Sequence, residues 1–148
     1  MDTSNCYTMN ILETELQNVL PFTNEVPIPP YTLQMETLEK IKATQKALRR
    51  SIELKNRLTS LINAYYLGKL FNEAETVAAK FKLKQKVTRH YVTMAEYMYD
   101  IFEPDPTQIY QTITLTVQQV RKLKKKEVLK LRLIVEENIH SSFDGAQN

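Results

Sequence analysis

The chain has 148 residues and a formal net charge of +3, with only two glycines, one cysteine and no tryptophan. Gly-rich phosphate loops and nucleophile elbows need residues that adopt positive φ cheaply, and two isolated glycines, Gly68 and Gly145, exclude both motifs. The lone Cys6 excludes an intramolecular disulfide and a thiolate metal cluster within one chain. The length suits one compact domain or an extended helical element.

The charge is unevenly distributed along the chain. Residues 1–40 contain six acids and one base, which leaves a charge of +8 on residues 41–148. The first 20 residues contain no lysine or arginine, which is not typical of a secretory or mitochondrial leader, and no apolar run approaches the ~20 residues that span a bilayer. We therefore expect a cytoplasmic protein without a transmembrane segment, with the nucleus as the alternative.

The N-terminal part predicts a short helix at about residues 9–20, followed by an extended segment. Pro21, Pro27, Pro29 and Pro30 lie in that segment, where they remove backbone donors and disfavour helix. We expect three regions: an acidic, proline-containing segment at 1–30, an α-helical domain at 31–140 and a flexible tail at 141–148.

Residues 32–67 contain nothing that breaks a helix. Leu38, Ile41, Leu48 and Ile52 recur at helical spacing, and the apolar stripe then shifts phase at Leu54 and Leu58. The shift predicts a bend, a break near Ser51, or a long helix that meets different partners along its length. If the helix packs on a partner, the candidate anchors are Leu38, Ile41, Leu48, Ile52 and Leu58.

Residues 61–81 predict a helical hairpin. Tyr65 would lie on its first helix, Gly68 near the end of that helix and Phe71 at the start of the second, with the small Ala74 and Ala78 allowing close approach.

The remaining elements start with an apolar stripe over residues 84–102, which predicts a further helix. Asp105 and Pro106 then form a good helix start. Residues 111–136 fit one long helix by their wheel pattern, but Thr112–Val117 also alternates strictly, so a β-hairpin is the alternative. The expected fold is mainly α, a bundle or short α-solenoid with at least one helical hairpin.

No constellation for catalysis or metal binding emerges. His90 and His140 are fifty residues apart, neither has a further ligand at metal-binding spacing, and the neighbouring acids diverge on a helix. We expect no enzymatic activity, no metal and no cofactor.

Two lysine- and arginine-rich segments stand out, residues 80–89 and 121–132. Solvated helix faces, an acidic partner that includes the chain's own N-terminal segment, and phosphate-bearing ligands all remain open for them. The candidate basic patch comprises Lys82, Lys84, Lys86, Arg89, Lys122, Lys124, Lys125 and Lys126.

Tyrosine is the other concentrated residue type. Its apolar ring and water-tolerant hydroxyl suit interfaces, although core packing is the more common role for any one ring. Tyr66, Tyr97 and Tyr99 are the candidates for a docking surface.

Three segments also occur in the order of similar segments in a known family. They are Pro21-Phe22-Thr23 with Pro29 and Pro30, the stretch 65–81, and Asp105-Pro106-Thr107-Gln108-Ile109-Tyr110-Gln111. Over about residues 20–112 the chain thus resembles the C-terminal helical domain of the coatomer alpha subunit. This resemblance implies a non-enzymatic α-helical scaffold that binds another coat subunit.

The sequence as a whole favours a non-catalytic α-helical interaction or adaptor subunit of a larger assembly, which binds a protein partner or a second copy through apolar helix faces. The alternative is a nucleic-acid binding protein, or one that binds an anionic surface, through segments 80–89 and 121–132.

Overall fold

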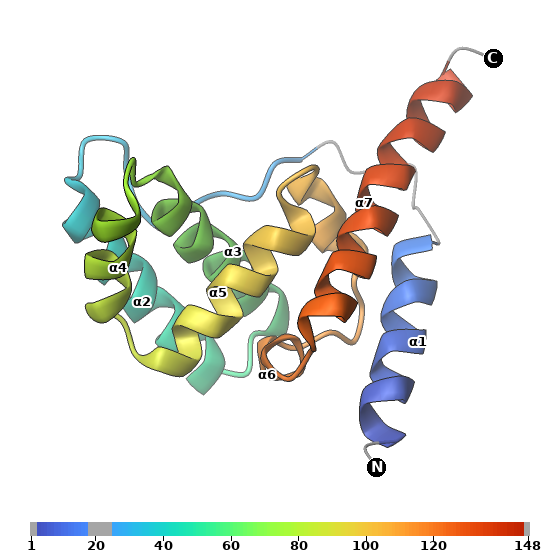
Figure 1. Ribbon diagram of the computed structural model, residues 1–148, viewed down its shortest axis with the longest axis horizontal. Coiled ribbons are helices and arrows are strands. Elements are labelled where there is room, and N and C mark those ends of the chain that lie inside the picture. The colour runs from blue at the N-terminus through green and yellow to red at the C-terminus, as the bar shows by residue number, and fades with distance from the viewer. Residues whose placement is uncertain (1–2, 18–24, 147–148) are drawn as a thin grey trace.

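A computed structural model describes the backbone of residues 3–17 and 25–146 (Figure 1). In chain order the elements are α1 (Thr3–Gln17), α2 (Thr37–Glu53), α3 (Arg57–Glu73), α4 (Val77–Gln85), α5 (Arg89–Phe102), the 3₁₀ helix η1 (Pro106–Gln111), α6 (Val117–Arg121) and α7 (Lys125–Ala146). These residues contain no β-strand, so the mainly α fold is confirmed. No described helix combines the length and apolar character that crossing a bilayer requires.

The long helix considered for residues 32–67 is two helices, α2 and α3, which pack against each other. The chain breaks at residues 54–56, where Lys55 adopts a positive φ of 55° and the side chain of Asn56 accepts a hydrogen bond from the Thr59 amide, 3.2 Å away, as the N-cap of α3. Ser60 Oγ donates to Ser51 Oγ across the pair at 3.0 Å. The phase shift in the apolar stripe therefore marks the end of one helix and the start of the next.

The predicted hairpin at residues 61–81 is wrong in its detail. Helix α3 continues through Gly68 to Glu73, and its main neighbours are α2 and α5 rather than α4. Gly68 lies where α3 crosses α5, so closely that an added Cβ would lie 2.2 Å from the Ala95 carbonyl oxygen and 2.7 Å from Tyr99 Cβ. The glycine therefore permits a close helix crossing and does not end the helix.

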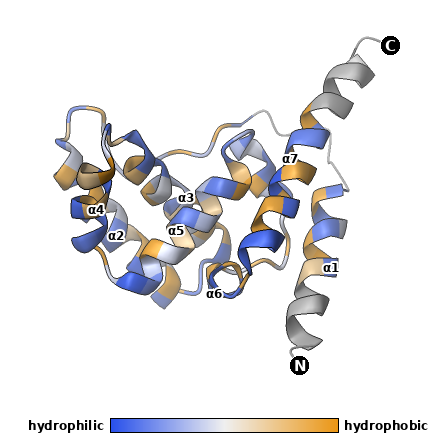
Figure 2. Cartoon of the chain, in the orientation of Figure 1, coloured by the Kyte–Doolittle hydropathy of each residue, from blue (hydrophilic) through white to orange (hydrophobic). Residues whose placement is uncertain are grey.

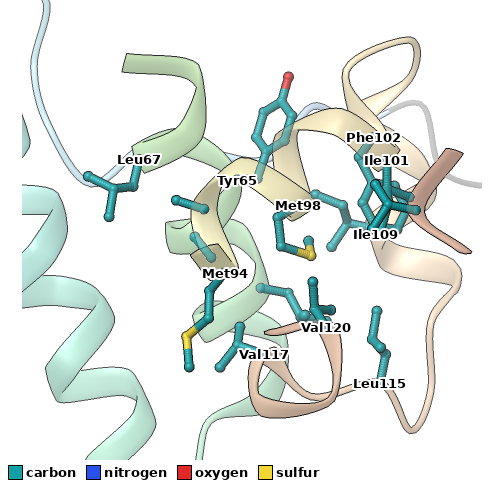
Figure 3. Close-up of a cluster of buried hydrophobic side chains, with 14 of the residues drawn as sticks. Tyr65, Leu67, Met94, Met98, Ile101, Phe102, Ile109, Leu115, Val117 and Val120 are labelled. Carbon is teal, nitrogen blue, oxygen red and sulfur yellow. The ribbon is translucent and has the colours of Figure 1, made fainter. Parts of the chain in front are cut away.

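Helix α3 is the centre of the core, with ten of its 17 residues buried. Met94 and Met98 of α5 pack toward Val117 and Val120 of α6, while the far end of α5 meets Ile109 of η1 (Figure 3). Helix α5 thus connects the α2–α3 pair to the C-terminal elements.

Residues 111–136 form neither one long helix nor a β-hairpin, so both alternatives are wrong. Residues 112–116 form an irregular segment with a bend at 113–114 and no partner strand. Arg57 donates to Thr112 Oγ1 (3.1 Å), the Thr112 carbonyl (2.8 Å) and the Leu115 carbonyl (3.0 Å). Glu15 of α1 accepts hydrogen bonds from the amide (3.0 Å) and the hydroxyl (2.8 Å) of Thr114. Thr116 and Gln119 then form a capping box that starts α6. Backbone carbonyls that would pair with a second strand in a hairpin therefore accept hydrogen bonds from the Arg57 side chain.

Helices α1 and α7 lie side by side at one edge of the molecule (Figure 1). Lys130 forms an ion pair of 2.9 Å with Glu13, and Asn138 Nδ2 donates to the Leu16 carbonyl at 2.6 Å. The acidic N-terminal segment therefore neutralises part of the basic segment, as one of the sequence alternatives held.

The predicted region boundaries stay predictions. Helix α1 starts earlier than the helix expected at 9–20, whose last three residues lie outside the described part, and α7 extends through most of the predicted tail at 141–148. The side chains of Cys6 and His140 lie outside the described residues.

Candidate docking surface

Helix α4 is the most exposed described helix of the domain. None of its nine residues is buried, and Val77 and Phe81 are 85% and 61% exposed. These two residues are four apart, which places them on one face of the helix. The Thr76 hydroxyl accepts a hydrogen bond from the Ala79 amide at 3.0 Å and so defines where the helix starts. We call Val77, Ala78 and Phe81 the α4 face; Figure 2 shows α4 with adjacent hydrophobic and hydrophilic residues at the edge of the fold.

Lysines recur along α4 and at its C-cap. Lys82 and Lys86 are exposed, whereas Lys84 lies 3.3 Å from Glu96 of α5 in a partly exposed ion pair. The exposed lysines make this end of the molecule positively charged, which favours an acidic ligand and raises the rate of encounter with it.

An apolar groove of about 370 Å³ runs along another side of α4, between this helix and the adjoining ends of α2 and α3. Its lining includes Ala74, Ala79 and Leu83. Leu38, next to the lining residue Thr37, is 39% exposed, and Leu33 in the preceding loop is 86% exposed. This end of the molecule therefore carries several apolar side chains that the described chain does not cover.

A polar pocket of about 220 Å³ separates α4 from α3 and α5. It is lined in part by Asn72, Lys80, Lys84, Glu96, Tyr99 and Asp100. Asn72 donates to the Tyr99 hydroxyl at 3.0 Å. Burial, and then the neighbouring Glu96, raise the pKa of Asp100 above its ordinary value. Within the described residues no group of three or more His, Cys, Asp or Glu side chains could hold a metal ion.

The predicted partner anchors fall into two groups. Ile41 and Leu48 are fully buried and Tyr66 is 4% exposed, with its hydroxyl donating to the Pro27 carbonyl. These three side chains belong to the core, which corrects their assignment to a docking surface. Among the other candidates, Ile52, Leu58, Tyr97 and Tyr99 are partly buried, and Leu38 is exposed.

Sequence periodicity cannot separate these groups, because a stripe that packs on α3 looks the same as one that packs on a partner. Val77 and Phe81 were missed because two apolar residues four apart in a helix of nine residues do not establish a period.

The basic candidates lie in two places. Lys82, Lys84, Lys86 and Arg89 belong to α4 and the start of α5, whereas Lys122, Lys124, Lys125 and Lys126 lie at the junction of α6 and α7. Arg132 in the second segment binds Glu103 at 2.8 Å and Glu136 at 3.0 Å. Arg132 is thus already paired, and the exposed lysines at 122, 124, 125 and 126 lie together at the α6–α7 junction.

Comparison of the chain with protein-family models, with curated proteins and with solved structures finds no match. The resemblance to the coatomer alpha subunit thus stays a prediction.

Proposed function

We propose that the protein is a non-catalytic α-helical adaptor subunit of a larger assembly, which docks an acidic amphipathic helix of a partner protein on the α4 face. The observation that carries the proposal is that none of the residues of α4 is buried, including the large apolar side chains of Val77 and Phe81. The proposed setting is the cytoplasm, with the nucleus as the alternative.

Energetics support a partner at this position. Full burial of a Val or Phe side chain is worth about 1.5–3 kcal/mol each, and α4 obtains little of this from its own fold. A partner helix with apolar residues at i and i+4 would cover Val77 and Phe81 together. The exposed Lys82 and Lys86 give this end of the molecule a positive charge, which attracts an acidic partner over a longer range than the apolar contact.

The test selects peptides of about 20 residues from a display library on the intact protein. We expect enriched sequences to combine glutamate or aspartate with leucine or phenylalanine at helical spacing. The V77S/F81S variant should lose affinity for them by at least about tenfold, because interface anchors cost about 1.4 kcal/mol or more when truncated.

The matched control is L129S/L133S, which removes two exposed apolar side chains, also four residues apart, from α7. It should bind the selected peptides like the wild type. Peptides that bind V77S/F81S unchanged, or enrichment of basic sequences, would contradict the proposal. Retention on anionic vesicles without any peptide binding would replace it with a membrane-surface function.

Nucleic-acid binding is the second candidate function. It is favoured by Arg121, Lys122, Lys124, Lys125 and Lys126, which are all exposed and which form no ion pair within the described residues. Reversal of the charges at 124, 125 and 126 should abolish retention on nucleic acid and flatten its salt dependence if this function holds. Unchanged retention would exclude it.

A further inference from the structure

Helix α7 carries a second apolar stripe that faces away from the domain. Leu129 and Leu133 are 61% and 56% exposed, and they lie on the side of the helix opposite the buried Leu131. Lys125 and Lys126 continue the stripe toward the N-terminus of α7. Toward the C-terminus it continues with Glu137 and with Glu136, which also forms an ion pair of 3.0 Å with Arg132. The stripe therefore has an apolar centre, a basic end and an acidic end.

Neither neighbouring helix covers the two leucines of the stripe, although Lys126 at its edge lines a hollow of about 330 Å³ with residues of α1. Helix α1 contacts α7 through the side chains of Lys130 and Asn138, and α5 is joined to α7 by Arg132, which donates to the Asp100 carbonyl at 3.0 Å. At about 100° per residue, these contacts flank or oppose the stripe. It is thus available to another molecule in the described conformation.

We propose that this stripe binds the same stripe of a second copy of the chain, with the two α7 helices antiparallel. A two-fold axis beside position 131 places Leu129 of each copy level with Leu133 of the other. The same axis brings Lys126 within about one helical rise, 1.5 Å, of the level of the second copy's Glu137, and Lys125 equally close to the level of its Glu136. These pairs also lie on matching flanks of the two helices, so one arrangement satisfies the leucines and the charges together.

The charge pattern selects this occupant. A parallel pair would set lysines against lysines and glutamates against glutamates, which is unfavourable. A nucleic acid or an anionic membrane lying along the stripe would meet Glu136 and Glu137. A ligand that fits must carry its negative charges beside the lysines and its positive charges beside the glutamates. A second copy of α7 in the antiparallel direction has its charges in that order, and an isologous interface pairs a surface with itself in this way.

The proposal has a structural consequence for the whole molecule. Helices α4 and α7 lie at opposite sides of the fold (Figure 1). A pair joined through α7 would therefore present two α4 faces directed away from the contact. This pairing does not depend on the function proposed for α4.

Two leucines per copy make a smaller contact than the ~1,600 Å² of a standard interface, so the dimer should dissociate on dilution. Sedimentation equilibrium between about 5 and 500 µM should show a monomer–dimer equilibrium for the full chain. The L129S/L133S variant should be monomeric over this range, while V77S/F81S should associate like the wild type. Circular dichroism checks that each variant keeps its helical content.

Charge exchange tests the antiparallel order independently of the leucines. Lys126→Glu and Glu137→Lys should each weaken association by about tenfold, since two symmetry-related attractions become repulsions, and the double variant should restore it. Lys86→Glu makes the same change in charge on α4 and should have no effect.

Three outcomes would overturn the proposal. A wild-type chain that is monomeric at about 500 µM forms no such dimer. Association that survives L129S/L133S uses another surface. Single charge variants that associate like the wild type exclude the antiparallel pairing.

Discussion

Substitution of Gly68 by alanine tests the close crossing of α3 and α5. The new Cβ would lie 2.2 Å from the Ala95 carbonyl oxygen and 2.9 Å from its carbonyl carbon. Real Cβ contacts do not fall below 3.0 Å, so the backbones must separate by most of an ångström. Overpacking of this kind costs about 1–3 kcal/mol and sometimes more, and the better helix propensity of alanine returns up to about 1 kcal/mol.

We therefore expect Gly68→Ala to lower the free energy of unfolding by about 2 kcal/mol, or the melting temperature by about 4–8 °C for a chain of this size. Urea denaturation followed by circular dichroism measures the change. Because the clash is with a backbone carbonyl, adding Ala95→Gly should not restore stability. Thr59→Ala, an exposed change in the same helix, is the control and should lie within about 0.5 kcal/mol of the wild type. A Gly68→Ala protein as stable as the wild type would refute the close crossing.

Three further predictions concern individual polar side chains. Arg57→Ala should cost about 2–4 kcal/mol in urea denaturation, because the carbonyls of segment 112–116 lose their donor, and Arg57→Lys should rescue only part of this since one ammonium cannot reproduce the forked guanidinium contacts. Tyr66→Phe should cost about 1 kcal/mol and speed amide exchange near Pro27, whose carbonyl accepts the Tyr66 hydroxyl; unchanged exchange would contradict this contact. The raised pKa of Asp100 means that its ionised form destabilises the fold, so Asp100→Asn should be more stable than the wild type at pH 7, with the difference vanishing as the pH falls below the ordinary value of 3.8; a constant difference in melting temperature across that range would contradict it.

Local signals in the sequence account for much of the secondary structure. Asp105 before Pro106 predicts a helix start, and the Asp105 side chain indeed accepts a hydrogen bond from the Thr107 amide at 3.2 Å, although the element is a 3₁₀ helix. The phase shift after Ile52 predicts a bend, a break near Ser51 or a long helix with different partners, and the structure has a break, at residues 54–56. Such signals can be predicted because caps and periodicity depend on residues a few positions apart.

The candidate site was predicted less well than the helices. Ile41 and Leu48 form a regular apolar stripe, but α3 covers it, whereas the exposed Val77 and Phe81 belong to a helix too short to show a clear period. A pattern shows which residues share a helix face, and only the neighbouring helices decide whether that face is covered.

The sequence by itself determined that this protein is built of helices and that an acidic N-terminal segment precedes a basic remainder. The tertiary structure alone decided that Gly68 permits a helix crossing, that Arg57 takes the place of a partner strand for segment 112–116, and that α4 and α7 keep apolar faces uncovered. The physical reason is the range of the interactions. Helix propensity and capping act within a few residues, whereas the close approach of α3 to α5 and the hydrogen bonds of Arg57 join positions that are 27 to 58 residues apart.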